Sequence, residues 1–91
     1  MKKIERLIIA GNKHIDSISP ISGANNMKFL WISDNKIKDL SPIESMLTLE
    51  SLYVEDNCII DFSAVEYLKQ NGKLTSVSGD SAEEQDYARC E

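Results

Sequence analysis

The chain has few of the residues that supply catalysis or covalent cross-links. Its 91 residues include two cysteines, two prolines, four glycines and one histidine. The cysteines, Cys58 and Cys90, are too few for a disulfide framework or a metal-binding cluster, and we expect an accidental or weakly structural role for both. Apolar runs end after four residues, as at 7–10, and the charged start lacks a signal-peptide pattern. The sequence therefore predicts a cytoplasmic protein with no membrane contact.

Positive charge is also scarce, and it is unevenly distributed. The net charge is −5. Residues 1–30 hold five basic and two acidic side chains, whereas residues 31–91 hold five basic and thirteen acidic ones. A protein that binds the phosphate backbone needs a basic stripe, so this distribution argues against direct nucleic-acid binding. It suits a protein partner with a basic surface, although acidity by itself mainly favours solubility.

The sequence does contain an internal repeat. Three segments begin at Ile4, Met27 and Leu49, which are 23 and 22 residues apart, and a truncated fourth begins at Leu74. Each full segment reads apolar-x-x-Leu-x-apolar-x-x-Asn, and each continues into apolar-x-x-apolar-Ser-Pro-Ile, with Ser-Ala-Val in the third. The first segment has one extra residue next to His14. Self-similarity at this period is typical of solenoid proteins.

This pattern resembles the leucine-rich-repeat family, in its 22-residue class, which occurs in bacterial internalins and in a regulatory subunit of protein phosphatase 1. The resemblance covers about residues 4–79, and the run Asn-x-Ile-x-Asp-Leu-Ser-Pro-Ile at 35–43 is close to the internalin-like consensus. It implies an α/β fold, a solenoid with a short parallel curved sheet on its concave face. The family shares an architecture and a way of binding rather than a chemistry.

The local pattern gives the same architecture from physical principles. Alternation at Leu-x-apolar predicts one short strand per repeat, and parallel stacking of such strands makes the sheet. The Ser-Pro-Ile segments predict 3₁₀ or short helical turns on the convex side, and the third repeat predicts a longer helix that ends at Asn71-Gly72. We expect Ser19, Ser41 and Ser63 to cap these helical segments. The predicted core is the set of apolar repeat positions, namely Ile4, Leu7, Ile9, Ile15, Ile18, Ile21, Met27, Leu30, Ile32, Ile37, Leu40, Ile43, Met46, Leu49, Leu52, Val54, Ile59, Phe62, Val65, Leu68, Leu74 and Val77.

The two ends of the repeat array differ. Residues 1–79 are assigned to the solenoid, and residues 80–91 to an acidic C-terminal cap or tail, either a short capping helix or a frayed end. At the N-terminal end, Ile4, Leu7 and Ile9 form a layer with one side uncovered, which solenoids normally protect. This uncovered edge predicts either a homodimer or a chain cut from a longer repeat protein.

The polar residues at turns give little support for catalysis. Asn12, Asn35 and Asn57 are expected to bond backbone groups at the turns. His14 has no nucleophile or second ligand at a recognisable spacing. Four acids, Asp34, Glu55, Asp56 and Asp80, are expected near one edge, but no loop has the ligand spacing of a calcium site. We therefore expect no enzyme, no metal and no cofactor.

The positions that the repeat leaves free should form three outward columns on the concave face. The middle column brings Ile8, Trp31 and Tyr53 together, with Phe29 beside them in the first column. Exposed contiguous apolar area marks interaction sites, and Trp and Tyr are enriched in binding hot spots. The alternatives are that the tail covers this patch, or that the aromatic pairs only stabilise neighbouring strands. The predicted columns are Arg6, Phe29, Ser51 and Ser76, then Ile8, Trp31, Tyr53 and Ser78, then Ala10, Ser33, Glu55 and Asp80.

These observations favour a non-enzymatic protein–protein interaction module with an aromatic, acid-rimmed concave face. An alternative is a small acidic inhibitor or immunity-type protein, similar to anti-CRISPR proteins or antitoxins, that blocks a basic nucleic-acid-handling enzyme. A third interpretation is a fragment of a longer solenoid without a separate function. The predicted partner-binding residues are Ile8, Phe29, Trp31, Ser33, Asp34, Tyr53, Glu55 and Asp56.

Overall fold

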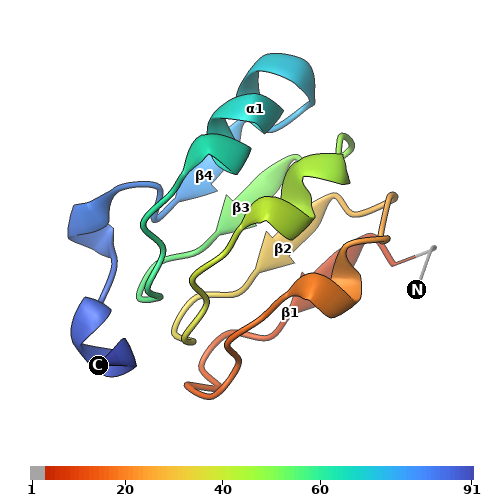
Figure 1. The fold of residues 1–91 in the computed structure, drawn as a ribbon. Helices are drawn as coiled ribbons and strands as arrows, with labels where there is room; N and C mark the ends of the chain where they lie inside the picture. Colours follow the sequence, from red (N-terminus) through yellow and green to blue (C-terminus); the bar gives the residue numbers. More distant parts are fainter. Residues whose placement is uncertain (1–3) are drawn as a thin grey trace.

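Four parallel strands form one sheet in chain order, β1-β2-β3-β4 (Figure 1). The structure is a computed structural model, and it describes residues 4–91. Each strand comes from one repeat, and the equivalent leucines pair across the sheet, with Leu7 beside Leu30 and Leu30 beside Leu52. The repeat register predicted from the sequence is therefore confirmed. The strands are β1 (Arg6–Ile8), β2 (Phe29–Trp31), β3 (Ser51–Tyr53) and β4 (Ser76–Ser78).

Helical segments return along the convex side after each of the first three strands, and Figure 1 shows all three on the same side of the sheet. Proline occurs at the start of the first two, which stay short 3₁₀ turns, whereas the third is a nine-residue α-helix. Among the described residues, no helix is long and apolar enough to cross a membrane. The segments are η1 (Ser19–Ile21), η2 (Ser41–Ser45) and α1 (Ser63–Asn71).

The prediction of serine caps is wrong. The three serines are the first residues inside the helical segments, and no side chain caps them in the usual position. Instead, the residue two positions earlier accepts the free backbone N–H: Ser41 donates to Asp39 Oδ1 and Ser63 donates to Asp61 Oδ1, both at 2.9 Å. The bond from the Ser63 backbone lowers the pKa of the Asp61 carboxyl. At Ser41 and Ser63 a carboxylate in an Asx-type turn thus replaces the expected hydroxyl cap, whereas at Ser19 the acceptor is the hydroxyl of Ser17, at 3.2 Å.

The core consists of the predicted apolar positions, but burial decreases toward the N-terminal end. Leu30 and Leu52, in the middle layers, are completely buried. Four first-repeat residues that were predicted as core are only partly buried, because β1 is the edge strand and no layer within residues 4–91 covers their outer side. Phe62 and Val77 are also partly buried. The four first-repeat residues are Ile4, Leu7, Ile9 and Ile15.

Two buried asparagines join successive repeats at the turns. The Asn57 side chain donates to the carbonyl of Ile32 in the preceding repeat and to that of Val54 in its own, both at 3.0 Å, and it accepts the N–H of Ile37 at 3.1 Å. Asn35 donates in the same way to Ile9, at 3.0 Å. The expected structural role is confirmed at both positions. The third asparagine, Asn12, is exposed and bonds only within its own turn, to Ile9.

The C-terminal tail follows β4 and lies along the turn edge of the second and third repeats, in two short 3₁₀ turns, η3 (Ala82–Glu84) and η4 (Tyr87–Cys90). Its Gln85 side chain donates to the carbonyl of Val54 at 3.0 Å and accepts the N–H of Ile59 at 3.1 Å. Asn57 makes the same two bonds one repeat earlier. Gln85 therefore takes the place of a fourth asparagine, although its position in the sequence does not fit the repeat.

A disulfide between Cys58 and Cys90 fixes the end of this tail to the third turn. The Tyr87 hydroxyl also donates to the carbonyl of Ile59 at 2.5 Å. The disulfide corrects the expectation that both cysteines are accidental or only weakly structural. Closing a loop with a sequence separation of 32 residues stabilises a fold by roughly 3–4 kcal/mol in the chain-entropy account. The tail is thus a fixed cap on the turn edge.

Removing the Gln85 amide should loosen the cap. In Gln85→Ala the buried N–H of Ile59 loses its acceptor, and the carbonyl of Val54 keeps only the bond from Asn57. The unpaired N–H should lower the free energy of unfolding by about 1–3 kcal/mol. Chemical denaturation measures this change. The exposed Gln70→Ala is the control and should change stability by less than about 0.5 kcal/mol. Equal values for the two variants would contradict the proposed role of Gln85.

Candidate protein-binding face

The outward side chains of the strands align in the predicted columns. Arg6, Phe29 and Ser51 are neighbours in the first column, as the strand pairing requires. Ile8, Trp31, Tyr53 and Ser78 follow one another in the second. Because strands in a sheet lie about 4.8 Å apart, side chains in one column reach each other. The predicted arrangement of these two columns is confirmed.

The aromatic rings contact one another on this face. The Tyr53 ring centroid lies 5.5 Å from that of Trp31 and 5.5 Å from that of Phe29, with both pairs tilted by about 50°. The guanidinium of Arg6 lies over the Phe29 ring, 4.5 Å from its centroid. Tilted rings at this separation attract each other, and a cation over a ring adds to this. We call Arg6, Ile8, Phe29, Trp31 and Tyr53 the aromatic face.

Part of the aromatic face is open to solvent. Ile8 is 51% exposed and Trp31 is 41% exposed, whereas Phe29 and Tyr53 are half-buried. The tail contacts described above fall on the turn edge, beyond the carboxyl ends of the strands (Figure 1). The alternative in which the tail folds over the aromatic row is therefore wrong. The alternative that the ring contacts stabilise neighbouring strands is consistent with the same distances.

Glu55, a predicted partner-binding acid, is bonded within the chain. Its two carboxylate oxygens accept hydrogen bonds from the hydroxyls of Ser33 and Ser78, each at 2.5 Å. Partial burial raises the pKa of Glu55, but the two hydroxyl bonds outweigh this and hold the pKa below its ordinary value of 4.5. Glu55 therefore links three strands, and its charge is partly satisfied before any partner arrives.

The other two predicted acids differ in what they contact. The carboxylate of Asp34 accepts a hydrogen bond from the Arg89 side chain at 2.6 Å, so the tail neutralises it. Asp56 is exposed. Both residues have positive φ, 62° and 56°, a conformation that aspartate tolerates better than most residues. Aspartate before each buried asparagine thus has a conformational role, and the acidic rim is weaker than the sequence indicated.

Asp80 does not extend the third column as predicted. The chain turns away at Gly79, whose φ is 97°, and Asp80 pairs with Lys69 of α1 at 2.9 Å. A Cβ at position 79 would lie 2.4 Å from the backbone nitrogen of Glu55, so only glycine fits there. Within residues 4–91, no three His, Cys, Asp or Glu side chains gather as metal ligands would.

Three residues of this region were not among the predicted site residues. Arg6 and Ser78 were placed in the correct columns, but the first was not expected to stack on Phe29 or the second to bond Glu55. Arg89 belongs to the tail, whose path the repeat pattern does not specify. For the first two, the signal was their position beside an aromatic residue and an acid in neighbouring strands.

The bonds to Glu55 predict a measurable pH dependence. Because its folded-state pKa is lowered, the ionised carboxylate stabilises the fold above pH 4.5, and this stabilisation is lost as the pH falls through the folded pKa. The difference in melting temperature between wild type and Glu55→Gln should be largest near neutral pH and shrink below pH 4.5. Thermal melts across this range test it, with the exposed Glu50→Gln as control. A difference that stays constant with pH would contradict this.

Comparisons with known proteins agree with this geometry. A family model described as leucine-rich repeats (two copies) matches residues 25–67. A comparison with curated protein sequences found no match.

Two solved structures of internalins from Listeria monocytogenes str. 4b F2365 are similar to this chain. One, inlF, is 32% identical, with a TM-score of 0.77 over 85% of this chain. The other, internalin C2, is 24% identical, with a TM-score of 0.78 over 86% of this chain. The chain spans 22% of the first structure's length and 33% of the second's. At these identities the second likeness concerns the fold alone.

Proposed function

We propose that this chain, which is built from leucine-rich repeats of the internalin-like class, is a non-enzymatic module that binds a partner protein through its aromatic face. The leucine-rich-repeat fold is typical of protein–protein interaction modules. The observation that supports this is the contact of Trp31 and Tyr53 beside the exposed Ile8 on the outer side of the sheet. A partner would remove this apolar area from water, and that burial is the main driving force of association.

The geometry gives each residue of the face a role in this proposal. Trp31 and Tyr53 are the anchors, because large rings that are already packed against a neighbour lose little conformational freedom on binding. Ile8 extends the apolar surface, and Phe29 packs behind Tyr53. Arg6 contributes a cation at the edge of the face, and Asp56 contributes an exposed carboxylate on the opposite side. Ser33, Asp34 and Glu55 act indirectly, since their polar groups are engaged within the chain.

Removing the anchors should weaken binding without unfolding the protein. We expect Trp31→Ala/Tyr53→Ala to reduce the affinity for the physiological partner by about 2 kcal/mol or more, roughly 30-fold or greater. Partners are captured by crosslinking and identified by mass, and the purified partner is then titrated calorimetrically.

The control is Tyr67→Ala, which removes another exposed ring, on α1, 47% exposed. It should leave affinity unchanged. Equal affinity for wild type and the double variant would refute the role of the aromatic face.

The same titration, repeated at several salt concentrations, distinguishes the interaction module from the alternative hypothesis. In that alternative the protein is an inhibitor whose acidic side chains imitate phosphates. Charge-dominated binding weakens steeply with salt, whereas an aromatic contact tolerates it. The engaged state of Glu55 and Asp34 favours the aromatic mode, because both carboxylates already have partners in the chain. A basic nucleic-acid enzyme as the captured partner, with steeply salt-dependent binding, would favour the inhibitor.

A homodimer through the N-terminal edge remains a second, independent expectation. The first layer leaves an apolar hollow of about 250 Å³, and its lining includes Ser17 and Pro20 beside core isoleucines. A second copy of the chain would cover this surface. Sedimentation at high protein concentration should then give twice the monomer mass, and Ser17→Arg, which places a charge in the hollow, should restore the monomer. A monomer mass for wild type would exclude the dimer.

The cytoplasmic location expected from the sequence stays a prediction. The Cys58–Cys90 disulfide argues against it, because disulfides are rare where glutathione keeps thiols reduced.

A further inference from the structure

A second hollow, away from the aromatic face, lies where the turns of the first two repeats meet the C-terminal tail. It has a volume of about 370 Å³ and is lined by Lys13, Lys36, Asp86 and Arg89. A smaller hollow of about 160 Å³ adjoins it, since Lys36 and Arg89 line both. We call the two together the turn-edge groove. Ligand sites in proteins commonly have volumes of roughly 300–1,000 Å³.

The groove depends on two departures from the regular repeat. Lys13 lies at the extra residue of the first repeat, and its φ is 63°. Arg89 comes from the tail and is held firmly: Asp34 and Asp86 bond its guanidinium at 2.6 and 3.2 Å, and its neighbour Cys90 is in the disulfide. The side of the groove that the tail forms is therefore fixed by Arg89, whereas the lysines line the other side.

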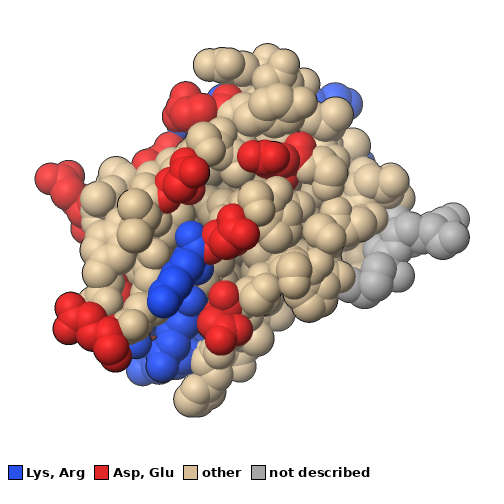
Figure 2. Space-filling model, in the orientation of Figure 1, with Lys and Arg blue, Asp and Glu red and all other residues tan. Residues whose placement is uncertain are grey.

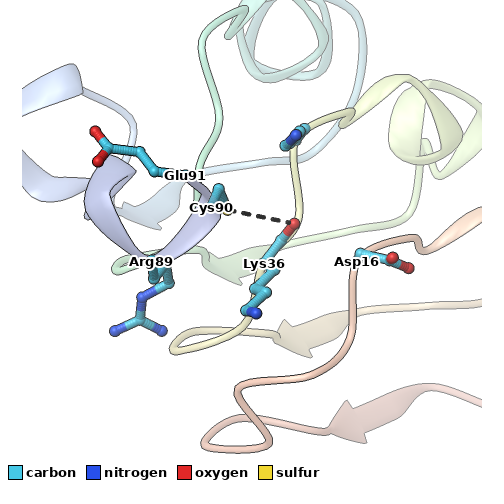
Figure 3. Close-up of a pocket in the computed structure, with 6 residues that line it drawn as sticks. Asp16, Lys36, Arg89, Cys90 and Glu91 are labelled. Atoms are coloured by element: carbon cyan, nitrogen blue, oxygen red, sulfur yellow. Dashed lines mark hydrogen bonds between the residues drawn. The ribbon is translucent and has the colours of Figure 1, made fainter.

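The lysines of the groove have no acidic partner. Among residues 4–91, every ion pair within 4.0 Å involves Lys28, Lys69 or Arg89, and none involves Lys13, Lys36 or Lys38. Figure 2 shows the largest group of Lys and Arg atoms on this side as one band at the lower left, with Asp and Glu on either side. In Figure 3, Lys36 and Arg89 point to the same side of the tail, whereas the carboxylate of Glu91 points away from them. The two linings together hold the cations Lys13, Lys36, Lys38 and Arg89 and the acids Asp16, Asp86 and Glu91. Asp86 is bonded to Arg89, so the three lysines are the cations of the groove that no ion pair occupies among residues 4–91.

The backbone of the groove excludes a phosphate cradle. Such cradles use free backbone N–H groups. Here the N–H of Lys13 donates to the carbonyl of Asp34 at 3.0 Å, and that of Lys36 donates to the carbonyl of Ile15 at 2.7 Å. The groups that remain available to a ligand are the lysine ammonium groups, which are compact charges on flexible stems. They surround a space that is large enough for several side chains of a ligand.

We propose that the turn-edge groove binds an acidic, carboxylate-bearing segment of a partner protein. Carboxylates of the segment contact the ammonium groups of Lys13 and Lys36, while Lys38 lengthens the positive track in the adjoining hollow. Arg89 positions the wall and is already neutralised by its two aspartates. This surface is separate from the aromatic face, so each can fail without the other.

A labelled hexaglutamate peptide tests the proposal by fluorescence anisotropy at low ionic strength. Wild type should bind it, and added salt should weaken the binding. Lys13→Gln/Lys36→Gln should weaken it by at least about tenfold. The matched control, Lys28→Gln/Lys73→Gln, removes the same charge from exposed lysines near the opposite ends of the strands and should change affinity less than about twofold. Thermal melts verify that both variants fold.

Each contrary result overturns the proposal. These results are no binding by wild type, equal weakening in both double variants, or equal binding of hexalysine. Inorganic phosphate that displaces the peptide more effectively than chloride at equal ionic strength would make a small oxyanion the ligand and overturn the assignment to a protein segment. Trp31→Ala/Tyr53→Ala should bind hexaglutamate as wild type does, which keeps this test distinct from that of the aromatic face.

Discussion

The stacking of this protein depends on one polar interaction repeated at the turns: a buried side-chain amide that bonds carbonyls of two successive repeats. The turns carry backbone groups into the interior, where an unpaired N–H or carbonyl costs about 1–3 kcal/mol. Asn35 and Asn57 satisfy these groups, and they fix the distance and register between layers at the same time. Leucine burial supplies most of the driving force, but it is nondirectional and would tolerate a slip that the amides do not.

The register set in this way decides what the concave face presents. With the layers aligned, the residue after each inward leucine stands beside its equivalent in the next strand. Trp31 and Tyr53 are therefore in contact because of a spacing of 22 residues in the sequence, and not because of any attraction specific to those rings. The same alignment lets the hydroxyls of Ser33 and Ser78 reach Glu55 from both sides. The repeat thus sets which side chains meet on the surface as well as in the core.

Features that recur in every repeat could be predicted from the sequence, and most features that occur once could not. The strands and the two columns that hold the aromatic face followed from the repeat, because each position recurs in three environments of the same kind. The helix at 63–71 followed instead from its own sequence, which has alanine in place of proline and ends at Asn71-Gly72. The tail occurs once, so no pattern gave its path, the pairing of Cys58 with Cys90 or the bond from Arg89 to Asp34. The acidic rim was overestimated for this reason. Charge counted along a sequence does not include partners from a segment whose position is unknown.

The amide of Gln85 has a consequence for how such proteins can be changed. In a solenoid each layer touches only its neighbours, so stability is nearly a sum of layer and interface contributions. Gln85 meets the last layer through the carbonyl of Val54 and the N–H of Ile59, and the second repeat offers the equivalent two groups, on Ile32 and Ile37, to Asn57. Through this amide the tail recognises backbone groups that the second and third repeats share. The tail is therefore a C-terminal cap that could be grafted onto a longer or shorter array of the same repeat.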